Sequence, residues 1–281
     1  MGIKQQPNRI KKGPLSPEDL RAVQLIQTEM LAEVDRICRL HNINYAMIGG
    51  TMLGAIRHKG YIPWDDDADI GLLRDEYERF RKVCETELDH DRFYFQDMRA
   101  TPGYRWGYGK IRRKDTYFLR EGQAHMPYES GIFIDIFPFD NVPDGKIAEK
   151  LHNLHCTIIR KILWSEVGKK MDANAFMRGV FSLLSLIPLE MVSNHLQRFS
   201  ARSNRKKYQR VRVITFPARD HVSEGRREWY EKTVEYQFES IRLLGTESAH
   251  EYLEHKFGEY RVTPPESERK SHPVSYYKLL E

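Results

Sequence analysis

The sequence predicts an α+β fold that ends in a mainly helical C-terminal region. Apolar residues recur at helical spacing over residues 20–40, and short apolar runs bounded by turn residues follow over 45–138. Helical spacing then returns from 146 to about 210. The chain has 281 residues, of which 40% are hydrophobic and 30% charged. It is therefore long and apolar enough to form a packed core, and global disorder is excluded.

The same patterns divide the chain into three parts. Residues 1–14 are basic and contain proline and glycine, which predicts a loose tail. Residues 15–145 contain the alternating helices and strands and are expected to form the core. Residues 146–281 are expected to form a mainly helical region that packs on this core.

The N-terminal half should begin with a long helix. Ser16 is a suitable cap, Pro17 suits the first turn, and the apolar spacing continues to about His41. The elements expected next are a buried strand over 45–48, a helix over 51–58 closed by Gly60, a strand over 67–72 and a helix over 75–88.

Further strands are expected over 93–95, 106–111, 116–119 and 131–138, and Pro138 should end the last of these. Pro188 is expected to interrupt the helical region. Near the C-terminus, alternation of apolar and polar residues predicts one strand over 233–243. A helix over 249–257 and an irregular tail should follow.

Composition excludes several classes of protein. The three cysteines are widely spaced and form no CxxC pair, so neither a disulfide framework nor a cysteine zinc site is expected. The most apolar stretch, 181–189, is too short to span a bilayer, and no apolar leader opens the sequence. The sequence therefore predicts a cytoplasmic protein, and contact with the inner face of the membrane is left open.

The formal net charge of +5 suits a polyanionic partner but does not choose one. The basic run over 202–212 is explained by a solvated helix face, so no nucleic acid is expected as a partner.

Four aspartates crowd into five positions at Asp65, Asp66, Asp67 and Asp69. Like charges this close repel each other unless a cation or a proton neutralises them, and a hard divalent metal such as Mg²⁺ (or Mn²⁺) prefers carboxylate oxygens. In a strand over 67–72, Asp67 and Asp69 would point to the same face. Asp135 lies alone in an apolar strand and could complete a three-carboxylate metal site, or act as a base.

The residues before the acidic run suggest a phosphate site. Gly49 and Gly50 permit a tight turn with exposed N–H groups, and Thr51 would begin a helix whose N-terminus favours anions. The cationic residues that could assist donor phosphate are Arg57, His58, Lys110 and Arg112.

Each of these features also has a purely structural interpretation. The glycines suit an ordinary turn, the acidic run a solvated loop, and Asp135 a salt-bridged core position. Arg57 and His58 suit the last turn of a helix, and Lys110 and Arg112 a basic sheet edge. Their combination in this order makes the functional interpretation the stronger one.

These residues resemble the LicD family, to which the fukutin-type glycan phosphotransferases are distantly related. The resemblance is carried by Ile48 to Thr51, by the long motif from Gly54 to Gly71, and by Ile134 to Pro138. It is fainter at 238–239 and 257–265. Ala68 departs from the isoleucine expected after Asp67, at a position without a polar role.

The resemblance implies a nucleotidyltransferase-like fold, a mixed β-sheet flanked by helices. It also implies that Gly49, Gly50 and Thr51 bind the donor and that Asp67, Asp69 and Asp135 form the metal site. The implied reaction moves phosphocholine, or a related phospho-alcohol, from CDP-choline or another CDP-alcohol to a sugar hydroxyl. The implied acceptor is a glycan or lipid-linked glycan of the lipopolysaccharide or teichoic-acid type.

A choline group would require aromatic faces around its quaternary amine. The candidates cluster near one predicted strand and are Tyr104, Trp106, Tyr108 and Tyr117, although ordinary half-buried strand aromatics are the favoured explanation of them.

Two other functions remain open at this point. The same acids could transfer a nucleotide from an NTP to a small hydroxylated acceptor. A non-catalytic protein could instead use its basic face to bind nucleic acid or a membrane surface. No role follows for Glu239 or His272.

Overall fold

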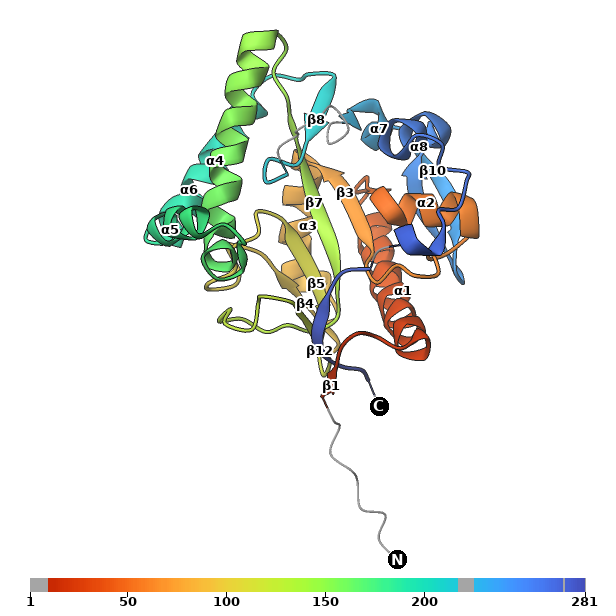
Figure 1. Ribbon diagram of the computed structural model, residues 1–281. Coiled ribbons are helices and arrows are strands. Elements are labelled where there is room, and N and C mark those ends of the chain that lie inside the picture. Colours follow the sequence, from red (N-terminus) through yellow and green to blue (C-terminus); the bar gives the residue numbers. More distant parts are fainter. Residues whose placement is uncertain (1–9, 217–224, 270, 281) are drawn as a thin grey trace, which may run out of the picture.

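The computed structural model describes residues 10–216, 225–269 and 271–280, so residues 1–9 of the predicted tail lie outside it. The fold is α+β, as predicted (Figure 1). Its main sheet is mixed, because β3 pairs with β7 and β11 with β2 in parallel, whereas the other pairs are antiparallel. The strands in spatial order are β10 (Thr233–Phe238), β11 (Ile241–Thr246), β2 (Ala46–Met47), β3 (Asp69–Leu73), β7 (Phe133–Asn141), β5 (Gly109–Arg113) and β4 (Phe93–Gln96).

Two short strands extend the far end of β7. β8 (Arg210–Arg212) pairs with β7, and β9 (Gly225–Arg226) pairs with β8. A separate small sheet joins β1 (Lys11–Lys12), β12 (Val274–Lys278) and β6 (Tyr117–Arg120). The C-terminal segment, expected to be irregular, therefore contains a strand and a 3₁₀ turn (Glu266–Glu268), because it finds β6 as a partner.

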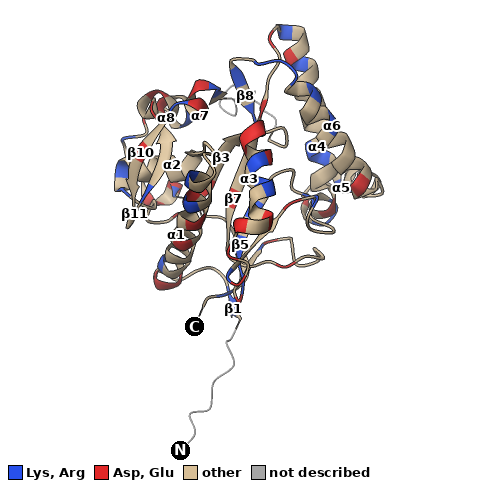
Figure 2. Cartoon of the chain, turned by 180° about the vertical axis from the view of Figure 1, so that it is seen from behind, with Lys and Arg blue, Asp and Glu red and all other residues tan. Residues whose placement is uncertain are grey.

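Helices α1 (Pro17–Leu40) and α3 (Arg74–Glu87) cover one face of the main sheet, which faces the viewer in Figure 2. The Ser16 side chain caps α1 by accepting a hydrogen bond from the Asp19 N–H at 3.1 Å, as predicted. Apolar side chains of α1 and α3 join those of β3 and β7 in the main core. Helix α2 (Gly49–His58), α7 (Glu228–Glu231) and α8 (Ala249–Phe257) lie toward the β10–β11 side.

Helices α4 (Lys146–Met171), α5 (Ala175–Leu184) and α6 (Leu189–Ser203) form a helical lobe at the other side of the sheet (Figure 1). Pro188 precedes α6 directly, so the predicted interruption is confirmed. Leu163 of α4 packs with Val192 and Leu196 of α6 in a core of their own. In the described part of the chain, no single helix is long and apolar enough to cross a membrane; α5 and α6, bent by 84°, meet that test only as a pair.

Several strand predictions were wrong at their ends, and the strand predicted over 106–111 runs from Gly109 to Arg113. β7 continues through Pro138 to Asn141. The Asp135 N–H donates to the Ala68 carbonyl on the β3 side. Backbone N–H groups alternate in direction along a strand, so the Pro138 nitrogen faces the β5 side. There the pairing with β5 extends only as far as Gly109, which lies opposite Ile136. The missing N–H of proline therefore costs no ladder hydrogen bond. At the other strand, β3 begins at Asp69, because the backbone over 62–66 forms a hydrogen-bonded turn and Asp67 lies before the strand.

The predicted strand over 233–243 is a hairpin. Glu239 turns the chain with a φ of 52° between β10 and β11. Its carboxylate accepts hydrogen bonds from Arg21 at 2.6 Å and from the Tyr61 N–H at 3.1 Å. Glu239 therefore joins α1, the 59–62 turn and the hairpin, a structural role that the sequence pattern did not reveal.

Candidate active site

The sheet brings the central acids together. Asp69 and Asp135 are register partners on the parallel strands β3 and β7, and Lys110 on β5 is the register partner of Asp135 from the other side. Register partners point to the same face of a sheet, so the three side chains lie side by side on the face opposite α1 and α3. The Lys110 ammonium forms an ion pair with the Asp135 carboxylate.

A cleft of about 620 Å³ opens over these residues. Of the predicted site residues, it is lined by Gly50, Asp67, Asp69, Lys110, Arg112 and Asp135. It is also lined by residues that the sequence did not single out for donor binding, among them Asp65, Arg120, Arg160, Trp164, Phe216 and His272.

The pKa values of three cleft acids are raised, because burial and neighbouring acids disfavour the charged form of each carboxyl group. The pKa of the Asp65 carboxyl is raised to about 8 by burial and then by the charges of Asp67 and Asp66. Burial, followed by the charges of Asp67, Asp135 and Asp65, raises the pKa of Asp69 well above its usual value. The Asp67 pKa is also raised by burial, although His272 and Arg120 oppose the shift. These carboxylates are therefore placed where an added cation would be bound strongly.

Asp66 differs from its neighbours because its ion pairs are shorter than those that the same two cations make with Asp67, where Arg120 lies at 3.4 Å and His272 at 3.2 Å. Arg120 donates to its carboxylate at 2.6 Å and His272 lies 3.0 Å from the other oxygen. Burial alone would raise the pKa of Asp66, but the hydrogen bond from His272 and the charge of Arg120 outweigh it and lower the pKa. His272 comes from the segment before β12, so the C-terminal part of the chain closes over the acidic turn.

The donor chemistry fits a hard divalent cation. Asp65, Asp66, Asp67 and His272 each offer a ligand atom within 4.8 Å of the others, and the carboxylates supply the oxygen ligands that Mg²⁺ and Mn²⁺ prefer. Among the described residues, the ligand atoms of this group lie closer together than those of the predicted trio of Asp67, Asp69 and Asp135. In that trio, Asp135 already forms an ion pair with Lys110. The metal assignment to that trio remains a prediction.

The N-terminus of α2 faces the acids. A side chain at Gly50 would place its Cβ only 2.5 Å from an Asp65 carboxylate oxygen, so that the carboxylate would have to shift. Gly49 has a φ of 55° and donates its N–H to the Tyr252 hydroxyl at 2.8 Å. The Thr51 hydroxyl accepts from the Asp69 N–H at 2.8 Å. Gly49 and Thr51 thus fix α2 to its surroundings, and Gly50 is the member of the predicted loop that lines the cleft.

Two predicted donor-binding residues lie elsewhere. Arg57 and His58 sit in the last turn of α2, at the opposite end from Gly50. The Arg57 guanidinium donates to the Tyr260 carbonyl at 3.0 Å and to His58 at 2.9 Å. Neither residue lines the cleft, because the helix carries them away from its N-terminus.

The cationic side chains of the cleft differ in whether groups of the protein already bind them. Lys110 pairs with Asp135, and burial lowers its pKa to about 8 against the opposing charge of that acid. Arg112 donates to Gln96 and to the Gly131 carbonyl, and Arg120 pairs with Asp66. The guanidinium carbon of Arg160 on α4 lies 5.1 Å from the ring centroid of Trp164 and 4.9 Å from that of Phe216. No acid of the described chain pairs with Arg160.

Aromatic side chains form the wall of the cleft next to Arg160. Trp106 and Trp164 lie with ring centroids 5.6 Å apart, and Tyr108 lies 4.6 Å from Phe137 and 5.6 Å from Phe216. Of the four predicted choline-site aromatics, Trp106 and Tyr108 line the cleft. Tyr104 is fully buried, and Tyr117 lines a different cavity.

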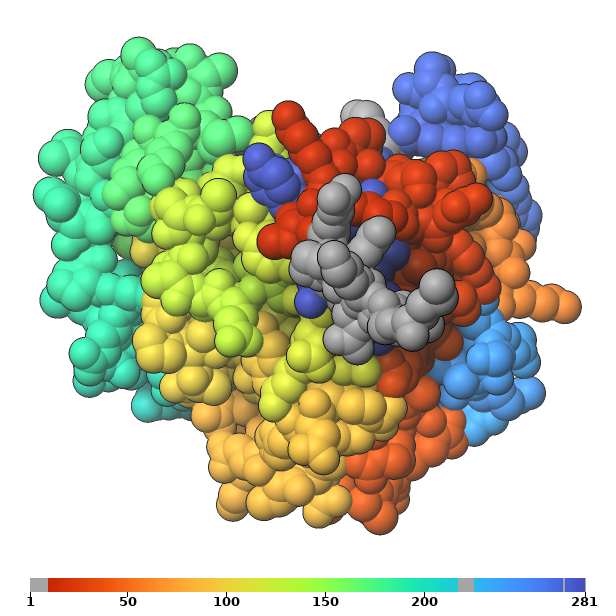
Figure 3. Space-filling model, turned by 90° about the horizontal axis from the view of Figure 1, so that it is seen from below, coloured from red at the N-terminus to blue at the C-terminus, as the bar shows by residue number. Residues whose placement is uncertain are grey.

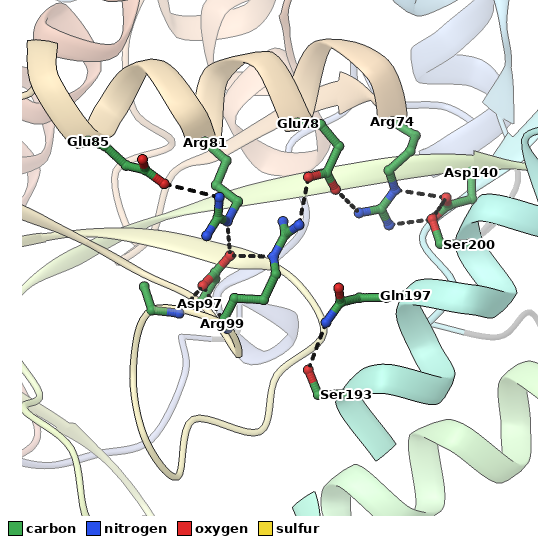
Figure 4. A network of polar contacts seen from close by, with 11 residues as sticks. Arg74, Glu78, Arg81, Glu85, Asp97, Arg99, Asp140, Ser193, Gln197 and Ser200 are labelled. Carbon is green, nitrogen blue, oxygen red and sulfur yellow. Dashed lines mark hydrogen bonds and ion pairs between the residues drawn. The ribbon is translucent and has the colours of Figure 1, made fainter. Parts of the chain in front are cut away.

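A second cavity of about 520 Å³ lies between α3, the 97–108 segment and α6, and Tyr108 borders both cavities. Figure 4 shows its polar groups paired with one another. Arg74 pairs with the buried Asp140 at 2.6 Å, and Arg99 bridges Glu78 at 2.7 Å and Asp97 at 3.4 Å. This arrangement stabilises the junction between α3 and α6 rather than leaving charges for a ligand.

The mixed sheet, the acids on adjacent strands and the glycine turn at a helix N-terminus agree with the nucleotidyltransferase-like fold that the sequence resemblance implies. Residues 42–157 match the sequence model described as the LicD/FKTN/FKRP nucleotidyltransferase domain. Residues 42–157 are therefore similar to the LicD/FKTN/FKRP nucleotidyltransferase domain, and the resemblance seen in the sequence is confirmed over these residues.

Three relatives are similar to this chain. The lipopolysaccharide cholinephosphotransferase LicD of Haemophilus influenzae is 29% identical over 268 residues, which cover 93% of this chain and 98% of that protein. An uncharacterized protein of Rickettsia prowazekii is 26% identical over 46% of this chain and 45% of its own length. One from Rickettsia typhi is 36% identical over 20% of this chain and 18% of its own length.

Proposed function

We propose that this protein transfers phosphocholine, or a related phospho-alcohol, from a CDP-linked donor to a sugar hydroxyl of a lipopolysaccharide- or teichoic-acid-type glycan. The similarity to the Haemophilus influenzae cholinephosphotransferase, which extends over nearly all of both chains, supports the reaction class. One structural observation carries the proposal: carboxyl groups with a raised pKa, an unpaired arginine and an aromatic wall line the same cleft.

The aromatic wall suits the quaternary ammonium group of choline. Such a cation is attracted to the faces of tryptophan and tyrosine rings, and Trp106, Trp164 and Tyr108 offer these rings within one cavity. The Trp106 indole N–H donates to the Tyr128 hydroxyl at 2.9 Å, which fixes the plane of the ring. The wall is therefore preorganised.

The acids would hold Mg²⁺ or Mn²⁺ through Asp67 and Asp69, with Asp65 as an additional oxygen ligand. When bound, the ion would neutralise phosphate oxygens and the charge that develops on the leaving CMP. Arg160 would bind the donor diphosphate, because it is the cleft arginine whose guanidinium has neither an acidic partner nor a hydrogen-bond acceptor in the described chain. Gly50 would add a backbone N–H at the N-terminus of α2.

Asp135 would accept the proton of the attacking sugar hydroxyl. The new bond joins that oxygen to the phosphorus of phosphocholine, and the bond between this phosphorus and the oxygen of CMP breaks. Lys110, which forms an ion pair with Asp135, would stay beside this carboxyl group during the transfer.

The direct test is a transfer assay with CDP-choline, Mg²⁺ and a choline-free glycan acceptor. We expect equimolar CMP release and a phosphocholine mass increment on the glycan, both lost with EDTA. CMP release without modification of any glycan would contradict the proposed acceptor. Glycan modification that does not require a divalent ion would contradict the proposed metal.

Nucleotide transfer from an NTP is the second candidate, because the matched domain is described as a nucleotidyltransferase domain and the same acids would serve. The two reactions leave different products. Pyrophosphate release from CTP or ATP in the presence of an acceptor, with no reaction of CDP-choline, would favour nucleotide transfer.

A further inference from the structure

Large apolar side chains are exposed mainly on the helical lobe. Nine of the seventeen exposed large apolar residues in the described chain lie between positions 147 and 191, with exposures from 48% to 78%. They are Ile147, Leu151, Leu154, Ile158, Met171, Phe176, Leu183, Leu186 and Met191. Seen from below, the lobe stands out beside the core (Figure 3). Such a concentration on one part of a molecule marks an interaction surface.

Four of these residues form one stripe along α4. Ile147, Leu151, Leu154 and Ile158 are spaced by four, three and four residues, which places them on one face of the helix. The opposite face carries Cys156, Ile159 and Leu163, which pack against α6. Helix α4 is therefore apolar on two faces: one packs against α6, and the other, the stripe, is exposed in the described structure.

The other end of the lobe repeats the pattern. Phe176 and Leu183 are seven residues apart on α5 and share one face, and Leu186 and Met191 are exposed at the bend into α6. The α5–α6 pair has the length and apolar composition of a membrane segment, although it is bent by 84°.

The charge of the lobe complements an anionic surface. Residues 146–203 contain nine lysines and arginines against four acids, an excess of five that equals the net charge of the whole chain. Basic residues occur along α4 and α6 (Figure 2). Lys146, Lys150 and Lys161 are exposed on α4 near the stripe, where their long side chains can reach a polar headgroup while the aliphatic residues insert. A second copy of the lobe would bring the same positive excess and would be repelled.

We propose that the outward face of the helical lobe docks on an anionic lipid bilayer, with the α4 stripe and the α5–α6 bend inserted at the headgroup boundary. One further argument for a bilayer rests on the proposed function. An acceptor of the lipopolysaccharide type carries lipid, so such an acceptor would lie at a membrane. Docking by the lobe would hold the cleft, which α4 borders through Arg160 and Trp164, close to such an acceptor.

The test is sedimentation of the full chain with vesicles of phosphatidylcholine alone and of phosphatidylcholine with phosphatidylglycerol in equal parts. We expect binding to the anionic vesicles that weakens with salt, and an affinity roughly tenfold lower for Leu151→Gln/Leu154→Gln/Ile158→Gln. Lys146→Gln/Lys150→Gln/Lys161→Gln should weaken binding to a similar degree. Leu25→Gln/Leu40→Gln on α1 is the matched control, since it also replaces exposed leucines and should leave binding unchanged.

Circular dichroism and thermal melting should show that all variants fold, because every replaced side chain is exposed. Equal vesicle binding by the stripe variant, or binding to neither vesicle, would overturn the proposal. A concentration-dependent dimer that the stripe variant abolishes would assign this face to a second copy instead. Release of CMP from CDP-choline with a soluble glycan acceptor should be unchanged in the stripe variant, so failure of membrane docking and failure of the proposed reaction are distinguishable.

Discussion

The two cavities that meet at Tyr108 differ in how their charges are balanced. Between α3 and α6, Arg74 pairs with Asp140 and Arg99 with Glu78 and Asp97, so these five charged groups are paired with one another. In the cleft, Asp65, Asp67 and Asp69 all have a raised pKa, and Arg160 has no acidic partner in the described chain. Charges balanced within the chain stabilise the fold, whereas charges left unbalanced in a cavity indicate what the cavity binds.

The largest effect should follow from removing a cleft acid. Asp69→Asn should reduce transfer by roughly 10³-fold, because it removes a ligand that would hold the metal against the transferring phosphate. Without metal, the variant should be at least as stable as the parent, because the substitution relieves repulsion from Asp67 and Asp135. Transfer assays and thermal melting check both parts; full activity would contradict the role of Asp69.

The matched change among the paired groups between α3 and α6 should act on stability. Asp140 is fully buried and accepts from Arg74, Ser200 and Asn204. Asp140→Ala would leave the arginine buried without its partner, so the free energy of unfolding should fall by about 3–5 kcal/mol. Urea denaturation measures this. A loss under about 1 kcal/mol would show that the network contributes little to stability.

Arg160→Met should raise the KM for the CDP-linked donor roughly tenfold or more, with a smaller change in kcat, because the anchor for the donor diphosphate is removed. Arg57→Met is the control, since Arg57 lies at the far end of α2 and its loss should leave this KM unchanged. An equal effect of the two changes would mean that the unpaired arginine does not identify the donor site.

Trp106→Ala should weaken binding of CDP-choline by about tenfold, while binding of CDP-glycerol, which has no quaternary amine, should change little. Tyr117→Ala provides the comparison, because Tyr117 lines another cavity. If both donors lose affinity equally, Trp106 supports the shape of the cleft and does not recognise choline.

The smallest effect should be a pH-dependent response to metal. Because the pKa of Asp65 is raised from 3.8 to about 8, the folded protein holds a proton that the unfolded chain would release. This contribution to stability is fully present below pH 3.8 and is lost as the pH rises through about 8. Mg²⁺ competes with the proton, so it should raise Tm more at about pH 8 than at about pH 6. An equal or larger rise at the lower pH would contradict this linkage.

Much of this arrangement could be predicted from the sequence, because local signals determine it. The cap at Ser16, the long helical spacing of α1 and the apolar run around Asp135 depend on neighbouring residues only. The glycine turn and the acidic run also lie close together in the chain. The fold class and the residues of the cleft floor followed from these signals.

The parts that were missed depend on contacts between distant segments. Arg160 and Trp164 reach the cleft from α4, and His272 reaches Asp66 across more than two hundred positions of sequence. The strand break at Glu239 was hidden because both halves of the hairpin continue the same alternation. Arg57 was misplaced because closeness in sequence to the glycine turn suggested closeness in space, whereas a helix separates the two.

The central claim, that the cleft binds a metal ion together with a CDP-alcohol, is tested most directly by thermal stabilisation. Melting would be followed with CDP-choline, CDP-ribitol, CDP-glycerol, CTP and ATP, each with and without Mg²⁺, for the parent and for Asp67→Asn/Asp69→Asn. We predict an Mg²⁺-dependent rise in Tm that is largest with CDP-choline and absent in the variant. A rise with CTP or ATP alone, or a CDP-choline effect that survives loss of both acids, would contradict the claim.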